Sequence, residues 1–143
     1  MNPFQIIIDT SVIISAIRSK RGASYHLLLS LGADSRWQIN LSTALLLEYE
    51  EKTRLIGAEF SYTDEQIDEF LDFICSVANE QKIHFRWRPF LKDANDEFVL
   101  ELSIASNADY ILTYNLRDFV GAEKFGIKVI TPKEFFQILG DIK

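Results

Sequence analysis

The sequence predicts an α/β fold: a three-layer α/β/α domain with a central, mainly parallel five-stranded sheet. Short apolar segments of strand length alternate along the chain with longer segments whose apolar residues recur at helical spacing. The first apolar run, 4–8, is too short for a helix and too apolar for an exposed strand, which is typical of a strand buried on both faces of a parallel sheet. Strands that alternate with helices form such sheets, with helices covering both faces.

Each element can be assigned in chain order. Strands are expected at 4–8, 37–41, 83–85, 110–113 and 128–130. Helices are expected at 12–17, 23–31, 42–56, 63–78, 93–107 and 131–139. Ser42 is a favoured helix cap, and capping boxes begin at Thr63 and Thr131. The spacing predicts an inner face of Ile67, Phe70, Leu71, Ile74, Val77 and Ala78 for the fourth helix, and of Phe98, Val99, Leu102 and Ala105 for the fifth.

Composition limits the protein class. A chain of 143 residues with 48% hydrophobic residues fits a single domain, 1–143. One cysteine, Cys75, excludes an internal disulfide, and no apolar stretch approaches the ~20 residues of a membrane helix. The N-terminus lacks the basic start of a signal peptide, so a cytoplasmic protein is expected. A net charge of -6 argues against a passive nucleic-acid binder, but not against an enzyme that uses cations to reach phosphate.

Acidic and amide residues gather after the predicted strands. Asp9 ends the first strand, Asp96 begins the helix after the third, and Asn115 and Asp118 follow the fourth. Glu48 lies about two turns into the helix after the second strand. Ligands of open α/β sheets bind outside the carboxyl ends of the strands, so all five side chains are expected at one edge of the sheet.

A divalent cation is the simplest way to hold ionised carboxylates together, because unscreened carboxylates raise each other's pKa. Oxygen ligands favour magnesium or manganese, and His26 and His84 are too few for a zinc site. Ordinary roles remain open for each acid: Asp9 as a helix cap, Glu48 in a salt bridge with Lys52 or an arginine, and the acids of 93–97 as partners of the helix dipole. Glu48 is also expected in an apolar stripe with Leu45 and Leu55.

Several ordered motifs resemble one known family. They are Ile-Ile-Ile-Asp9-Thr10-Ser11-Val12, the stretch from Ser42 to Leu47-Glu48-Tyr49, Asp93-Ala-Asn-Asp96-Glu97, Thr113-Tyr-Asn115-Leu-Arg-Asp118-Phe119 and Ile130-Thr131-Pro132. Together they are similar to the PIN domain family of metal-dependent ribonucleases, in particular to the bacterial VapC-like toxins of toxin–antitoxin pairs. The similarity runs almost end to end, and the fold class above is PIN-like.

The resemblance implies function and site residues. It implies endonucleolytic hydrolysis of single-stranded RNA with Mg²⁺ or Mn²⁺, an antitoxin protein as partner, and a homodimer or higher homo-oligomer. It assigns catalysis to Asp9, Glu48, Asp96 and Asp118, and metal binding to these four together with Asn115. Asn115 stands where many relatives carry an aspartate, which leaves the number of bound ions open. Ala94 stands where relatives commonly carry proline.

Other residues and other functions follow from the same reading. Hydroxyls of Thr10, Ser11 or Thr113 are expected to hydrogen-bond around the metal ligands. The basic residues Arg18, Lys20 and Arg21 are candidates for contacts to RNA phosphates. The alternative function is a catalytically weak or inactive module that binds RNA or a protein partner. A receiver-type phosphoacceptor domain fits poorly, since no aspartate ends the predicted third strand.

Overall fold

The computed structural model describes residues 2–82 and 94–143, with the backbone alone for residues 94 and 95. The strands are β1 (Phe4–Ile8), β2 (Trp37–Leu41), β3 (Asn79–Glu80), β4 (Tyr110–Leu112) and β5 (Lys128–Ile130). The α-helices are α1 (Thr10–Arg18), α2 (Ala23–Leu29), α3 (Thr43–Gly57), α4 (Asp64–Val77), α5 (Ala94–Ala105) and α6 (Pro132–Leu139). Short 3₁₀ helices are η1 (Ala58–Phe60), η2 (Leu116–Phe119) and η3 (Ala122–Phe125).

The five strands form one parallel sheet in the order β3-β2-β1-β4-β5. The central strand β1 pairs with β2 on one side and with β4 on the other, so that Ile6 lies between Ile39 and Tyr110. Ile6, Ile7 and Ile8 are all fully or almost fully buried. The expectation of a strand at 4–8 is therefore confirmed, but full burial holds for Ile6, Ile7 and Ile8 alone, since Phe4 and Gln5 are half-buried.

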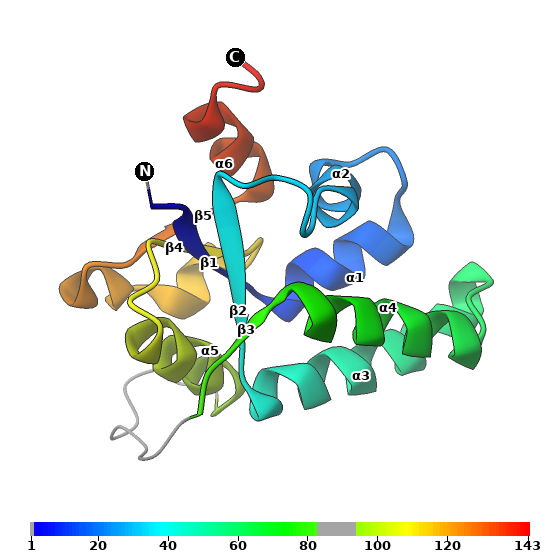
Figure 1. Cartoon of the computed structure of the whole chain (residues 1–143). Helices are drawn as coiled ribbons and strands as arrows, with labels where there is room; N and C mark the ends of the chain where they lie inside the picture. The colour runs from blue at the N-terminus through cyan, green and yellow to red at the C-terminus, as the bar shows by residue number, and fades with distance from the viewer. Residues whose placement is uncertain (1, 83–93) are drawn as a thin grey trace.

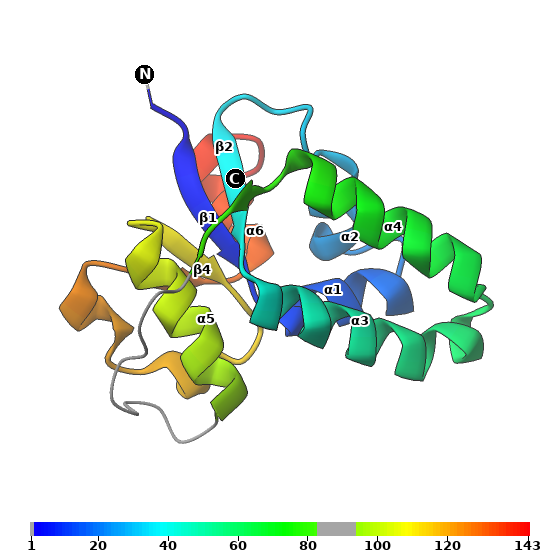
Figure 2. The same ribbon diagram turned by 60° about the horizontal axis from the view of Figure 1, so that its bottom comes forward.

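Helices cover both faces of the sheet, which confirms the predicted α/β/α class (Figure 1). α1, α2, α3 and α4 lie on one side, and α6 packs against α2 (Figures 1 and 2). α5 lies on the opposite side and contacts β1, α3 and η2. Along the described residues, no helix has the length and apolar character that crossing a bilayer requires.

The helix starts follow the predicted capping chemistry. The Ser42 side chain accepts a hydrogen bond from the Leu45 amide at 3.2 Å and caps α3. Thr63 and Thr131 form complete capping boxes with Gln66 and Glu134 at the starts of α4 and α6. These caps fix where each helix begins, and for α3 this sets the position of every later side chain, including that of Glu48.

The predicted helix faces are only partly right. In α4, Ile67, Leu71 and Ile74 are buried, whereas Phe70 and the last residues of the helix are half-buried. In α5, Val99 and Leu102 are buried as expected, but Ala105 is exposed, and Leu100 is buried in addition. The buried face of α5 is wider than one stripe because this helix packs against a strand, a helix and a 3₁₀ turn at once.

The strand beside β2 was not predicted. β3 pairs Asn79 with Asn40 and Glu80 with Leu41 directly after α4. Asparagine and glutamate are depleted in strands, so local propensity gives no signal for this strand. The strand expected at 83–85, the start of the helix at 93 and the acid Asp93 lie outside the described residues.

Two arginines connect distant segments at the surface. Arg36 binds Asp34 at 2.7 Å and Asp141 at 2.8 Å, which joins the start of β2 to the C-terminus. The hydrogen bonds from Arg36 lower the pKa of Asp34 to about 2. Arg54 on α3 contacts Asp64 and Asp68 on α4. Exposed pairs of this kind contribute little individually, so they add only modestly to the packing of α3 on α4 and of the C-terminus on the start of β2.

Gly32 gives a stability test of the turn after α2. Its φ is +75°, and an added Cβ would lie 2.6 Å from Val77 Cγ1. Gly32→Ala should lower the free energy of unfolding by about 2 kcal/mol, because it combines left-handed strain with overpacking. Gly22→Ala is the matched control, since Gly22 has φ of -81° and no atom within 4 Å of the added Cβ. Urea denaturation measures both, and equal losses would contradict this account of Gly32.

Candidate functional site

Asp9 lies at the carboxyl end of the central strand and is buried. It occupies the N-cap position of α1, but its side chain makes no capping hydrogen bond. Its Oδ2 atom instead accepts hydrogen bonds from Ser11 Oγ and Thr113 Oγ1, each at 2.7 Å. The Asp9 side chain therefore does not act as a helix cap, the ordinary role that the sequence leaves open for it.

The two hydroxyls that bind Asp9 are themselves oriented by backbone amides. The Tyr114 amide donates to Ser11 Oγ at 3.1 Å, and the Asn115 amide donates to Thr113 Oγ1 at 2.9 Å. The two hydroxyl oxygens also lie 3.2 Å apart, and each can donate its single proton to Asp9 Oδ2, which is nearer. In the described part of the chain, Asp9 Oδ1 makes no hydrogen bond, so one oxygen is held by two donors while the other is left for a ligand.

The hydroxyl residues expected around Asp9 are thus Ser11 and Thr113, and not Thr10. Thr113 is fully buried at the end of β4. Thr10 is also buried, and its Oγ1 has no hydrogen-bond partner among the described residues. The sequence names all three candidates but cannot separate them, because the choice depends on how β1 and β4 pair.

Glu48 is brought close to Asp9 by the residue that follows it. α3 buries Leu45, Tyr49 and Thr53, which recur every four residues on one face, and Glu48 lies half-buried beside this face. The Tyr49 hydroxyl donates to the carbonyl oxygen of Ile8, immediately before Asp9. Burial raises the pKa of Tyr49 well above its usual range, and the charges of Asp9 and Glu48 raise it further.

The charges of both carboxylates therefore affect the same phenol, although Asp9 and Glu48 are 39 positions apart in the chain. The apolar stripe expected around Glu48 does not extend along the helix, because Leu55 is 75% exposed. The helix face that packs inward is centred on Tyr49, one residue further on, and Leu55 lies beyond its edge.

Asp96 lies in the first turn of α5 and is half-buried. α5 precedes the parallel strand β4, so its first turn lies toward the carboxyl edge of the sheet. The helix contacts β1, α3 and η2, which are the elements next to Asp9, around Glu48 and around Asp118. Asp96 is thus toward the same carboxyl edge of the sheet as the other predicted acids, although α5 and α3 lie on opposite faces.

Asn115 and Asp118 form an exposed turn after β4. The Asp118 amide donates to the Asn115 carbonyl at 3.0 Å, and the Asn115 amide connects to Asp9 through the Thr113 hydroxyl. This is also the geometry of an ordinary turn. The turn is joined to Asp9 through its own backbone amide and the Thr113 side chain, and this link does not involve the side chains of Asn115 and Asp118.

The donor chemistry at this edge fits a hard cation, because every candidate ligand is an oxygen atom. Across residues 2–82 and 94–143, however, no group of three carboxylate, histidine or cysteine side chains is arranged to hold a metal ion. Asp9 and Glu48 are both near enough to Tyr49 for their charges to raise its pKa, after the larger effect of burial. His26 is exposed on α2, and His84 lies outside the described residues.

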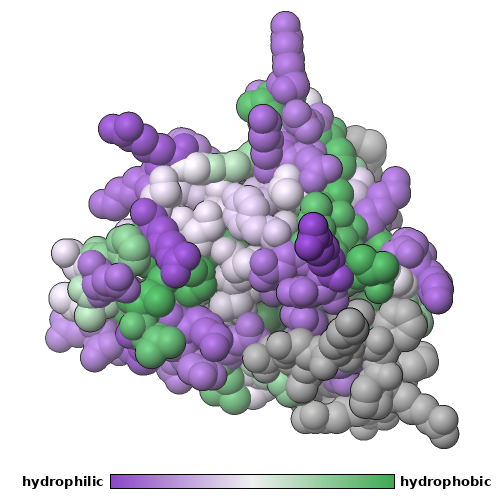
Figure 3. Space-filling model, turned by 180° about the vertical axis from the view of Figure 1, so that it is seen from behind, coloured by the Kyte–Doolittle hydropathy of each residue, from purple (hydrophilic) through white to green (hydrophobic). Residues whose placement is uncertain are grey.

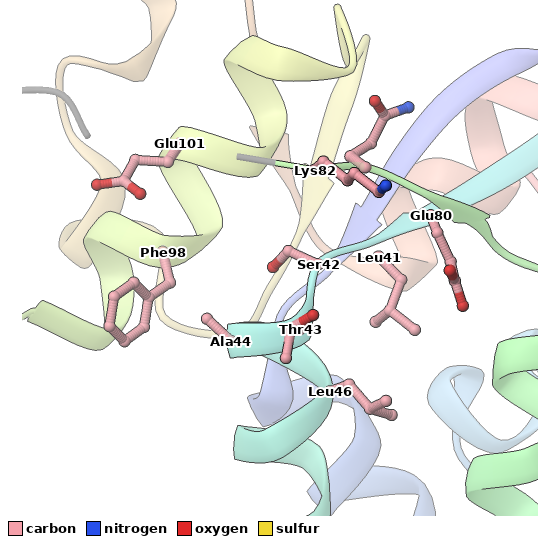
Figure 4. Close-up of a pocket in the computed structure, with 10 residues that line it drawn as sticks. Leu41, Ser42, Thr43, Ala44, Leu46, Glu80, Lys82, Phe98 and Glu101 are labelled. Carbon is pink, nitrogen blue, oxygen red and sulfur yellow. The ribbon is translucent and has the colours of Figure 1, made fainter. Parts of the chain in front are cut away.

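A separate cavity of about 520 Å³ lies between α5 and the start of α3 (Figure 4). Phe98 and Glu101 come from α5, and Ser42 and Thr43 come from the junction of β2 and α3, with Lys82 beyond β3. None of the predicted acids in the described ranges lines it. Among the described residues, this cavity and the predicted acids therefore do not coincide.

Comparison with known proteins identifies the family. No curated protein matches this chain in sequence. Two solved structures share its fold: VapBC2 from Rickettsia felis bound to a DNA fragment from their promoter, and VapBC-1 from nontypeable Haemophilus influenzae. The first is 18% identical, has a TM-score of 0.60 and covers 88% of this chain and 98% of its own. The second is 16% identical, has a TM-score of 0.60 and covers 91% of this chain and 99% of its own.

At these identities the two structures support the fold alone. The family assignment comes from sequence, because the PIN domain family model matches residues 5–117. This range contains the central strand, the helices α1 to α5 and four of the five predicted site residues. Since the match covers well over half of its length, the chain belongs to the PIN domain family.

Proposed function

We propose that this protein is a metal-dependent endoribonuclease that hydrolyses phosphodiester bonds of single-stranded RNA, and that it acts as the toxin of a toxin–antitoxin pair. The observation that carries the proposal is the arrangement of Asp9, whose Oδ2 is held by two hydroxyls while Oδ1 is left for a cation. Membership of the PIN domain family and the fold shared with the VapBC structures support it.

The residues proposed to hold Mg²⁺ or Mn²⁺ are Asp9, Glu48, Asp96, Asn115 and Asp118. Such an ion supplies an activated water and neutralises charge on the scissile phosphate. Asn115 offers a neutral carbonyl oxygen in place of a carboxylate, so the set carries four negative charges over five ligands. This charge favours hard divalent cations.

The chain itself supplies orientation and proton handling. Ser11 and Thr113 hold the Asp9 carboxylate through Oδ2, which would leave Oδ1 to bind the cation. Glu48 and Asp118 are proposed to orient the attacking water by accepting its protons, or to hold a second ion. Attack of the water oxygen on phosphorus breaks the bond to the leaving oxygen, which takes a proton as it departs.

The proposed partner is an antitoxin protein encoded in a neighbouring reading frame, and the proposed state is a homodimer or higher homo-oligomer in the cytoplasm. The support is the fold shared with two proteins described as VapBC assemblies. An antitoxin must block the site or the binding of RNA to it, and the acids proposed here give it a negatively charged target.

Cleavage of generic single-stranded RNA with Mg²⁺ or Mn²⁺ tests the activity. Asp9→Asn and Asp96→Asn should each lower the cleavage rate by about 100-fold or more. Even the loss of a residue that only hydrogen-bonds a metal ligand lowers metal affinity or activity by about 10- to 100-fold. A chelator should stop the parent enzyme. Rates are measured by electrophoresis of an end-labelled RNA, with circular dichroism to check folding.

Asp72→Asn is the matched control, because Asp72 is an exposed carboxylate on α4 away from the proposed site. It should cleave like the parent. If Asp9→Asn and Asp96→Asn also cleave like the parent, the site assignment is wrong. If the parent binds RNA but does not cleave it with either metal, the protein is the non-cutting module.

Tyr49→Phe tests the link between Glu48 and Asp9. The change removes only the hydroxyl that binds the Ile8 carbonyl, so it should lower the free energy of unfolding by about 1 to 3 kcal/mol. It should also weaken Mn²⁺ binding by about 10-fold, because α3 is then less firmly held against β1. Calorimetric titration with Mn²⁺ and urea denaturation measure the two effects.

Tyr62→Phe serves as the control, since the Tyr62 hydroxyl makes no hydrogen bond within the described ranges. It should change neither quantity. A Tyr49→Phe protein that loses stability but binds Mn²⁺ as tightly as the parent would show that the bond is structural only.

A further inference from the structure

Tyr114 lies in the turn between Thr113 and Asn115, next to the proposed site, and is held at both ends. Its amide donates to Ser11 Oγ at 3.1 Å, the same hydroxyl that binds Asp9. Its phenolic oxygen lies 2.8 Å from Ser24 Oγ on α2. The backbone and the tip of the side chain are therefore both fixed.

The ring between these two anchors is not covered. Ser24 is fully buried, so the hydroxyl end of Tyr114 reaches into the protein, yet the residue is 44% exposed. Tyr49 and Tyr110 are 3% and 9% exposed, as expected for aromatic residues of a core. In the described part of the chain, no aromatic ring packs against Tyr114. The fold holds an aromatic surface rigid in solvent beside the acids.

Three cations that form no ion pair among the described residues are close in sequence to Tyr114 or to Ser24, which binds its hydroxyl. Arg117 is three residues after Tyr114, and Lys20 and Arg21 immediately precede α2, which carries Ser24. All three are exposed. Within residues 2–82 and 94–143 they form no ion pair, whereas Arg36 and Arg54 bind two and three carboxylates.

This distribution of charge matters because the protein carries a net charge of -6 and the proposed site is acidic. A polyanion approaching the acids needs local positive charge, and Arg117, Lys20 and Arg21 are close in sequence to Tyr114 or to its partner Ser24. A partner protein that docked an apolar surface on Tyr114 would not need these cations. On the face that Figure 3 shows, hydrophobic side chains gather in separate patches with hydrophilic side chains between them.

We propose that Tyr114 is a stacking platform for an RNA base next to the cleaved phosphodiester, with Arg117, Lys20 and Arg21 contacting the adjacent phosphates. The inference rests on the proposed function and names how its substrate is held. Every base has a face that can stack, so the subsite tolerates sequence but requires an unpaired base. A ring that is already fixed loses little conformational freedom when the base binds.

Binding of a fluorescein-labelled 12-nucleotide RNA in EDTA tests the proposal without cleavage. Tyr114→Leu should weaken binding by about 10-fold or more, because it removes the stacking surface. Tyr114→Phe keeps the ring and loses only the Ser24 bond, so it should stay within about 3-fold of the parent. Fluorescence anisotropy measures the affinities, and Phe73→Leu, which changes an aromatic residue of 43% exposure on α4, is the matched control.

A second readout reports stacking itself. An RNA that contains 2-aminopurine should lose fluorescence when it binds the parent or Tyr114→Phe, and much less with Tyr114→Leu at saturating protein. Arg117→Gln should instead reduce the slope of log affinity against log salt concentration by about 1, which corresponds to one lost phosphate contact. The quenching of 2-aminopurine should stay unchanged.

Equal affinities and equal quenching for the parent and Tyr114→Leu would overturn the proposal, as would a parent that does not bind single-stranded RNA. A loss of self-association in Tyr114→Leu by sedimentation, with RNA binding intact, would identify a protein contact instead and also overturn it. A parent that binds RNA through Tyr114 but never cleaves it with Mg²⁺ or Mn²⁺ would refute the nuclease function and keep the stacking subsite.

Discussion

The hydrogen bonds to Asp9 Oδ2 are the interaction on which the proposed site depends. A carboxylate that is 5% exposed is unfavourable unless donors compensate for its lost water, and two hydroxyls do so here. Ser11 and Thr113 can donate to Asp9 because backbone amides occupy their acceptor sites. The orientation of one side chain thus follows from the pairing of β1 with β4, and a shift of that register would undo it.

The helix α3 is the second fixed point, and it is joined to the same strand. Ser42 sets its first residue, and Tyr49 attaches it to the carbonyl just before Asp9. One buried phenol therefore joins the helix that carries Glu48 to the strand that ends just before Asp9. Burial, and after it the charges of Asp9 and Glu48, raise the pKa of Tyr49, so its hydroxyl stays protonated and can donate to the Ile8 carbonyl.

The sequence was sufficient for the layers of the fold, because apolar strands and capped helices leave strong local signals. It failed at β3, where Asn79 and Glu80 pair through backbone atoms alone and have no strand propensity. It placed Asp9 at a strand end but could not choose between a cap and a ligand, since Thr113 is 104 positions away. The anchoring of Tyr114 by Ser24 is equally non-local, so no spacing in the chain reveals it.

The central place of β1 also has a consequence for synthesis on the ribosome. The first strand to emerge has β4, which ends at Leu112, as its neighbour on one side. The hydroxyl of Thr113 that fixes Asp9 is made later still. A nascent chain can therefore build α1 to α4 against β1 and β2 while the acidic edge stays unformed. The site becomes complete only when about four-fifths of the chain has been translated.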